Sequence, residues 1–315
     1  MVLIAGLALA AIVLTGAAVR LSQAGLGCEN WPSCSDERFV PAWAFLPWVE
    51  FGNRLISGVV AVAAAAAVLS AYRRQPRRVD LIHWAWGLVA GVVGQIVLGG
   101  ITVRVELHPA FVGVHFLLSM ILLWNAIVLW VRAGSGPSRG RASVPASVIY
   151  HGRALLIMAS AVLVTGTLVT GTGPNSGDAK AERLNLSLTE IARVHSATVW
   201  CFTIVAVLLA LRLSKLTSSE PSAVSRWLLV VVVAQGGIGY LQYALGVPAA
   251  LVEVHILGSV VVWSLSVLLY LRLFARQPAE VPIDKSAEIP RSAGPAQIQA
   301  AEAVNDSPVL DTMKS

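Results

Sequence analysis

Eight apolar segments, each about 20 residues long, restrict the folds open to this chain more than any other feature of its sequence. A segment of that length can cross the hydrocarbon core of a bilayer as a helix, and inside the core every backbone polar group must be bonded within its own segment. We therefore expect an all-α membrane protein with eight transmembrane helices. The predicted spans cover residues 2–20, 50–71, 81–102, 109–131, 152–171, 189–213, 226–246 and 249–274.

The charged residues lie between these segments and predict how the chain is oriented. Hydrophobic residues make up 56% of the sequence and charged residues 13%, with a formal net charge of +6. The basic residues do not form one patch, which argues against a nucleic-acid partner. They favour the loops after the second, fourth and sixth spans and the segment after the eighth, and basic loops stay in the cytoplasm. Both termini are therefore predicted to be cytoplasmic.

The spacing of glycine and histidine residues reveals an internal repeat. Gly99 lies sixteen residues before His115, and Gly239 lies sixteen residues before His255. Other matches occur in the same order: Val114 with Val254, Ser119 with Ser259, Pro109 with Pro248, and Thr15-Gly16 with Thr165-Gly166. An even number of helices in each copy gives both copies the same orientation in the membrane. The pattern predicts two repeated four-helix bundles.

The same pattern divides the chain into four parts. Residues 1–132 and 151–275 are the predicted four-helix halves, and residues 133–150, rich in Gly, Ser and Pro, are a predicted cytoplasmic linker. From residue 276 to residue 315, Pro, Ala, Ser and acidic residues dominate and large apolar residues are sparse. Such a composition buries too little apolar surface to offset the entropy of ordering, so we expect a disordered cytoplasmic tail.

Three histidines occupy matched depths in alternate spans. His115, His195 and His255 each lie five to seven residues inside a span from its outer end, and Asn53 takes the corresponding place in the second span. A single histidine inside a span would most simply bond a backbone carbonyl, but three at one depth favour a shared ligand. Imidazoles from facing helices clamp haem iron. No Cys, Met or carboxylate ligands converge there, which disfavours zinc or copper.

Three charged residues lie close to the predicted ligand positions. Glu50 precedes Asn53 by three residues and shares its helix face. It is either an interfacial residue paired with Arg54 or a proton-handling group beside a haem edge. Arg54 and Arg193 either anchor their helices at lipid headgroups or bind haem propionates, because arginine pairs with carboxylates through two hydrogen bonds.

Cys28 and Cys34 lie in the first outer loop, six residues apart across a Pro-containing turn. A disulfide persists outside the cytoplasm, and this spacing permits one. The pair is either redox-active beside the haem site or a structural staple of the loop.

The chain resembles the haem A synthase family over residues 1–275. Five motifs carry the resemblance: Thr-Gly-Ala-Ala-Val-Arg-Leu-Ser-Gln-Ala-Gly-Leu-Gly-Cys-Glu-Asn-Trp-Pro-Ser-Cys (15–34), Glu-Phe-Gly-Asn-Arg (50–54), Leu-Gly-Gly-Ile-Thr-Val (98–103), Gly-Thr-Gly-Pro-Asn-Ser-Gly-Asp (171–178) and Arg-Val-His (193–195). The resemblance implies an oxidoreductase of the cell membrane that converts haem O to haem A by oxidising the C8 methyl group of haem O to a formyl group.

The resemblance also implies two unequal sites. The carboxyl-terminal half would hold a haem b cofactor through His195 and His255, and the amino-terminal half would receive haem O near His115. Glu50 matches the family's functionally important glutamate. The partners implied are the lipid bilayer, a haem O synthase, assembly factors of the terminal oxidase and a second copy of the chain.

Two departures from the family pattern stand out. The family's motif in the second span is Glu-x-x-His-Arg, but this chain has Asn53 at the histidine position, and Asn175 replaces a frequent histidine after Gly-Thr-Gly-Pro. Asparagine is a poor iron ligand. We therefore hypothesise a five-coordinate iron on His115 that is open on its other side.

Two other functions remain open at this point. A two-haem electron-transfer cytochrome would explain the histidines equally well, but not Glu50 or the Cys28 and Cys34 loop. A transporter with repeats predicts a polar site at the membrane midplane, whereas the polar residues here lie near the outer face.

Overall fold

The computed structural model describes residues 1–136, 142–216 and 219–274, and these residues form eight α-helices. All eight are long and apolar enough to cross a membrane, which confirms the predicted all-α class and the number of spans. Residues 276–315, predicted as a tail, and residues 137–141 of the predicted linker lie outside the described part of the chain. The helices are α1 (Val2–Leu21), α2 (Phe45–Arg73), α3 (Val79–Arg104), α4 (Pro109–Ala133), α5 (Ala146–Thr172), α6 (Leu188–Leu213), α7 (Ser219–Ala244) and α8 (Ala249–Arg272).

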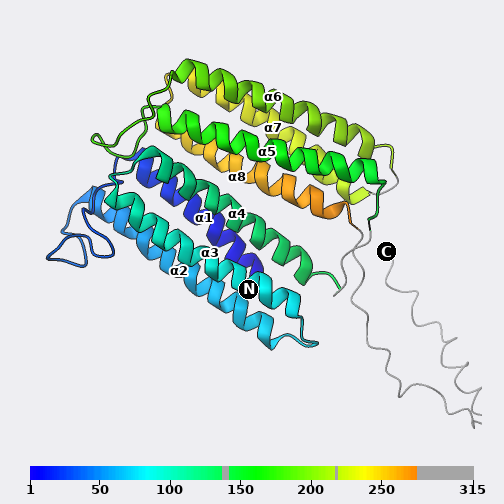
Figure 1. Ribbon diagram of the computed structural model, residues 1–315, viewed down its shortest axis with the longest axis horizontal. Coiled ribbons are helices and arrows are strands. Elements are labelled where there is room, and N and C mark those ends of the chain that lie inside the picture. Colours follow the sequence, from blue (N-terminus) through cyan, green and yellow to red (C-terminus); the bar gives the residue numbers. More distant parts are fainter. Residues whose placement is uncertain (137–141, 217–218, 275–315) are drawn as a thin grey trace, which may run out of the picture. The chain divides into compact units, whose positions relative to one another are not determined.

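Consecutive helices run antiparallel and lie side by side (Figure 1). Helix α1 contacts α2 and α4, and α3 contacts the same two helices, so α1–α4 close into a ring. Helices α5–α8 close into a second ring in the same order, with α5 and α7 each contacting α6 and α8. The two rings meet through α4 with α5, α4 with α8, and α1 with α8. Within each ring, the second and fourth helices lie diagonally opposite.

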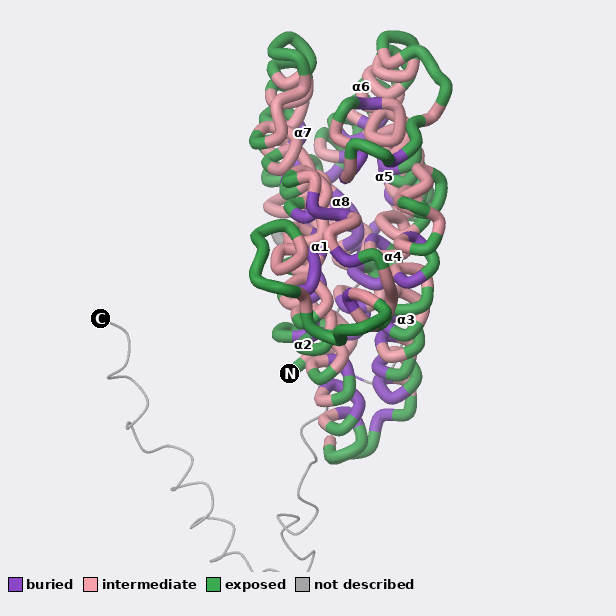
Figure 2. The backbone as a smooth tube through the Cα atoms, turned by 90° about the vertical axis from the view of Figure 1, so that its left-hand side faces the viewer, coloured by how far each residue is buried: buried purple, intermediate pink, exposed green. Residues whose placement is uncertain are grey.

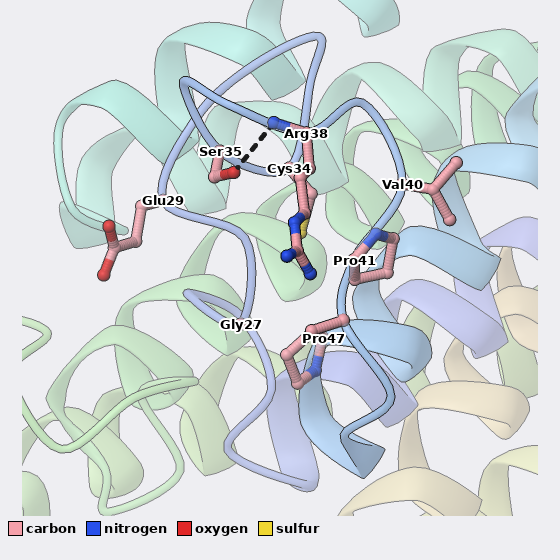
Figure 3. A pocket seen from close by; sticks show the side chains of 9 residues that line it. Gly27, Glu29, Cys34, Ser35, Arg38, Val40, Pro41 and Pro47 are labelled. Carbon is pink, nitrogen blue, oxygen red and sulfur yellow. Dashed lines mark hydrogen bonds between the residues drawn. The ribbon is translucent and has the colours of Figure 1, made fainter.

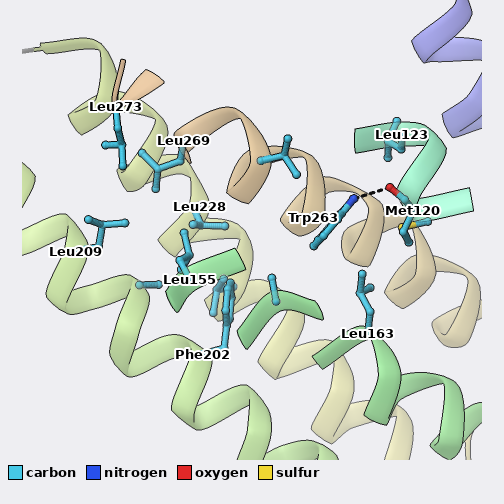
Figure 4. Packing of buried hydrophobic residues seen from close by; sticks show 14 of the residues in the cluster. Met120, Leu123, Leu155, Leu163, Phe202, Leu209, Leu228, Trp263, Leu269 and Leu273 are labelled. Carbon is cyan, nitrogen blue, oxygen red and sulfur yellow. Dashed lines mark hydrogen bonds between the residues drawn. The ribbon is translucent and has the colours of Figure 1, made fainter. Parts of the chain in front are cut away.

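Buried residues of the helices lie where helices face one another, and much of the outer surface is exposed (Figure 2). The largest buried cluster centres on α5–α8 and reaches α4 (Figure 4). There the Trp263 indole N–H donates to the Met120 carbonyl oxygen at 2.8 Å, joining α8 to α4. A buried indole N–H needs a partner, so this bond fixes how the two rings meet. Exposed Leu, Val and Ile side chains cover the outside, as expected of a surface that faces lipid.

The connections after α1, α3, α5 and α7 gather at one end of the helices, which we call the long-loop end because it carries segments 22–44 and 173–187. At the opposite end, buried Arg78 ties the α2–α3 connection to α4. Its guanidinium donates to both carboxylate oxygens of Asp80 at 2.8 Å and to the Ser135 carbonyl at 2.7 Å. The Asp80 carboxylate raises the pKa of Arg78 above its ordinary value.

Candidate functional site

The three histidines share one local geometry. Each lies near the long-loop end of an even-numbered helix, and Cε1 of its ring packs against a glycine of the preceding helix. A methyl group added to that glycine would lie 3.3 to 3.4 Å from Cε1 of the imidazole. The pairs are Gly99 with His115, Gly166 with His195, and Gly239 with His255. Glycine at these positions leaves room for an imidazole between helices.

Asn53 occupies the fourth place in this series. Its amide nitrogen is the atom nearest to Gly16 of α1, 3.8 Å from the position that a methyl group on this glycine would take. The Thr15 hydroxyl donates to Asn53 Oδ1 at 2.8 Å. In the other ring, Thr165 Oγ1 lies 2.9 Å from His195 Nδ1. The Thr-Gly dipeptides that marked the repeat in the sequence therefore contact Asn53 of α2 and His195 of α6.

The Thr165 hydroxyl also lies within hydrogen-bond distance of the backbone carbonyls of Ala161 and Val162, at 3.0 and 3.1 Å. When it donates to one of these carbonyls, it can accept a hydrogen from His195 Nδ1, because a hydroxyl has only one proton to give. In that tautomer the lone pair lies on Nε2, which is the form that a metal-binding imidazole requires.

His195 and His255 lie on diagonal helices α6 and α8. His115 and Asn53 occupy the corresponding diagonal helices of the other ring, α4 and α2. Nδ1 of His115 and Nδ1 of His255 are buried with no hydrogen-bond partner in the described part of the chain. Nε2 is therefore the nitrogen that each can present to a ligand.

These residues fit haem. Haem iron takes neutral imidazole as an axial ligand, and two imidazoles from diagonal helices can bind it from opposite sides. His195 and His255 have this arrangement, and His115 can supply one ligand in the other ring. Among residues 1–136, 142–216 and 219–274, no group of three or more His, Cys, Asp and Glu side chains could hold a bare metal ion.

Glu50 lies one turn nearer to the long-loop end than Asn53 and is almost fully buried, with 5% of its surface exposed. Its Oε2 accepts a hydrogen bond from the Cys28 backbone N–H at 2.7 Å, and its Oε1 pairs with Arg54 at 2.5 Å. The Arg54 guanidinium also donates to three carbonyls of the α1–α2 loop, those of Asn30, Pro32 and Ser33, at 2.9 to 3.3 Å. Glu50 and Arg54 together fix this loop over the start of α2.

The α1–α2 loop contains the cysteine pair. Cys28 and Cys34 are bonded in the structure, with their Cα atoms 4.4 Å apart, and both side chains are buried against Phe51 and Trp48 of α2. A small pocket opens beside Cys34, lined by Arg38 and Pro47 among others (Figure 3). The pair therefore lies directly above the face of α2 that carries Glu50.

Arg20 is a residue that the sequence analysis did not single out as part of a site. Its side chain is half-buried, and its Nη2 donates to the Thr170 carbonyl of α5 at 2.7 Å. Nearby, the Gly25 N–H donates to the Gly177 carbonyl at 2.9 Å. These bonds join the long-loop ends of the two rings. In the sequence, Arg20 is marked by its place in the motif that covers residues 15–34.

Arg193 lies two residues before His195 on α6 and is exposed. Within the described residues its guanidinium makes no hydrogen bond or ion pair, so it differs from Arg54, which is held by four partners. Arg193 remains able to reach a ligand near His195.

Comparison with known proteins gives one consistent result. The sequence model of the family described as cytochrome oxidase assembly protein matches residues 42–174. The haem A synthase of Geobacillus kaustophilus is 37% identical over 125 residues, which is 36% of this chain and 38% of that protein. The haem A synthase of Bradyrhizobium diazoefficiens is 25% identical over 327 residues, which is 86% of this chain and 90% of that protein. The chain is therefore similar to haem A synthases.

The similarity to haem A synthases is uneven along the chain. The matches to the Geobacillus kaustophilus and Symbiobacterium thermophilum enzymes span only 38% and 40% of those proteins. The family model covers α2–α5. Glu50, Asn53, Arg54 and His115 therefore fall inside the match. His195 and His255 lie beyond residue 174, where the longer match to the Bradyrhizobium diazoefficiens protein supports the relationship.

Proposed function

We propose that the protein is a haem A synthase, which oxidises the C8 methyl group of haem O to a formyl group and so supplies haem A to a terminal oxidase. The observation that carries the proposal is the set of three histidines, each seated against a glycine at one level of the helices. In overall balance, the methyl group and one water give the formyl group, four protons and four electrons. The enzyme must therefore bind haem O, pass electrons to an acceptor and release protons.

The two rings would divide this work. Haem b would bind in the carboxyl-terminal half, residues 151–275, between His195 and His255, and haem O would bind in the amino-terminal half, residues 1–132, on His115. When bound, haem b supplies one-electron redox chemistry. Thr165 would orient the His195 ring through its contact with Nδ1, which leaves Nε2 for the iron. Trp263 and Arg20 hold the rings in a fixed relation, which keeps the distance between the haems constant.

Glu50 would act at the substrate side. Its carboxylate shares the α2 face with Asn53 and is oriented by Cys28 N–H and Arg54, so it can accept protons released from the methyl group at Oε1 or Oε2. Arg193 and Arg54 are the proposed partners of haem propionates. Arg193 is free to reach a carboxylate, whereas Arg54 would do so while still holding the loop.

We further propose that the two rings are copies of one four-helix unit in the cell membrane, with both termini in the cytoplasm. The basic residues of the α2–α3 and α4–α5 connections support this orientation. It places the long-loop end outside, where a Cys28–Cys34 disulfide persists. Haem O synthase and oxidase assembly factors are the proposed partners within the membrane.

The experiment is to incubate membranes that contain the protein with haem O in air, extract the haem and identify the products by chromatography and mass spectrometry. A haem A synthase gives the formyl product. A protein that binds two reducible haems but returns haem O unchanged is an electron-transfer cytochrome, and this result refutes the proposal. Membranes that carry His115→Ala serve as the matched control, because this variant leaves His195 and His255 intact.

A further inference from the structure

Asn53 and His195 are held in the same way but differ in what they can do. Each lies against the glycine of a Thr-Gly pair in the preceding helix, and each is bonded to the threonine of that pair. Gly16 and Thr15 hold Asn53, as the corresponding pair of α5 holds His195. The matched Thr-Gly pairs of α1 and α5 therefore indicate that Asn53 takes the position that His195 takes in the other ring.

The direction of the threonine hydrogen bond decides which end of the Asn53 amide is free. Thr15 Oγ1 is 2.8 Å from Asn53 Oδ1 and 3.3 Å from the Ile12 carbonyl, so its proton is directed to the amide oxygen. The amide Nδ2 then keeps both hydrogens, and the described residues offer it no acceptor. In the other ring Thr165 Oγ1 lies 2.9 Å from His195 Nδ1, and Nε2 of the imidazole is left to bind a ligand.

An amide N–H is a hydrogen-bond donor, whereas the lone pair of Nε2 is a metal ligand. Asn53 lies on α2, diagonal to His115 on α4, as His195 on α6 is diagonal to His255 on α8. Iron bound to His115 would therefore meet a donor on its other side instead of a second imidazole. This arrangement suits a small ligand that can bind iron and accept a hydrogen bond at once.

We propose that the α1–α4 ring holds its haem through His115 alone, and that Asn53 Nδ2 donates a hydrogen bond to a small anionic or water-like ligand in the sixth position of the iron. The inference rests on the proposed function only in requiring that this ring binds haem. It assigns Thr15 as a positioning residue, which acts by holding the amide oxygen Oδ1 and leaving Nδ2 as the donor. The ligand class includes water, hydroxide and azide.

The test uses the full-length purified protein loaded with excess haem O, with azide as the probe. Electron paramagnetic resonance and absorption spectra of the wild type should show a low-spin haem from the α5–α8 ring and a high-spin haem that binds azide. Asn53→His should convert the high-spin signal to low spin and abolish azide binding. Asn53→Leu, which is similar in size but has no donor, should keep the high-spin signal and weaken azide binding roughly 3- to 10-fold.

The two threonines provide matched controls. Thr15→Val should weaken azide binding as Asn53→Leu does, whereas Thr165→Val should alter the low-spin signal and leave azide affinity unchanged. A wild-type protein that shows only low-spin haem, or no response to azide, overturns the inference. Azide affinity that is equal in the wild type, Asn53→Leu and Thr15→Val overturns the donor role. These spectra do not depend on whether haem O is oxidised. Failure of the proposed function would appear instead in the haem extraction experiment, as haem O that is returned unchanged.

Discussion

Replacing Glu50 by glutamine should loosen the α1–α2 loop without removing a side chain. Glu50 has 5% of its surface exposed and accepts hydrogen bonds from the Cys28 N–H and from Arg54. Hydrogen bonds to charged groups contribute about 1.5–3 kcal/mol and neutral ones about 0.5–1.5 kcal/mol. Glu50→Gln keeps the size of the side chain and removes its charge, so we expect opening of the loop to become easier by about 1–2 kcal/mol. The open fraction then rises roughly 5- to 30-fold.

Hydrogen–deuterium exchange measured by mass spectrometry reports this change directly. Peptides that cover residues 24–34 should exchange faster by that factor in Glu50→Gln, with the Cys28 amide among the affected sites. Glu29→Gln is the matched control, because Glu29 is an exposed carboxylate of the same loop and makes no hydrogen bond among the described residues. Unchanged exchange of this segment in Glu50→Gln would show that the carboxylate does not hold the loop, and its role would then be confined to proton transfer.

Two further substitutions test the packing of the bundle. Gly166→Ala should push the His195 ring by a few tenths of an ångström, because the new methyl group would lie 3.3 Å from Cε1, and the low-spin haem spectrum should shift. Gly52→Ala, where nothing lies within 4 Å, should leave the spectrum as it is, and a shift in both variants would refute the packing argument. Trp263→Phe removes the bond to the Met120 carbonyl, which is worth about 1 kcal/mol, and should lower the unfolding temperature by about 2 °C. An unchanged unfolding temperature would show that the bond from Trp263 to the Met120 carbonyl does not stabilise the protein.

The sequence predicted the number of helices and the level of the histidines because both depend on local properties. A span is defined by its apolar length, and the depth of a residue follows from its distance to the end of the helix. The starts of some helices were less accurate. Helix α2 begins at Phe45, five residues before the predicted span, because apolar residues and Pro47 in the first turn extend the helix beyond the membrane core. Glu50 therefore lies inside α2 instead of at its end.

The contacts that shape the site depend on the path of the loops and were not predictable from spacing. The sequence offered an ion pair between Glu50 and Arg54 as one alternative, and the structure contains it. It gave no sign that Arg54 would bind three loop carbonyls, because a carbonyl has no sequence signature. The bond from Arg20 to Thr170 joins residues 150 positions apart, and no local pattern encodes such a contact.

The repeat was the feature that linked sequence to structure most closely. The Thr-Gly pairs were recognised only as markers of duplication, and their side chains proved to hold Asn53 and His195. The hypothesis of an open iron site came from Asn53 alone. The hydrogen bond from Thr15 shows that the amide oxygen of Asn53 is held and the amide nitrogen is left as a donor, which the residue type alone could not show.

Haem extracted from cells that produce both haem O and this protein tests the central proposal most directly. The host must make haem O through a haem O synthase and have no haem A of its own. We predict that cells with the wild-type protein yield haem A, and that cells with His115→Ala yield only haem O and haem b. Recovery of haem O alone from cells that contain the folded, haem-loaded wild-type protein would contradict the proposed function.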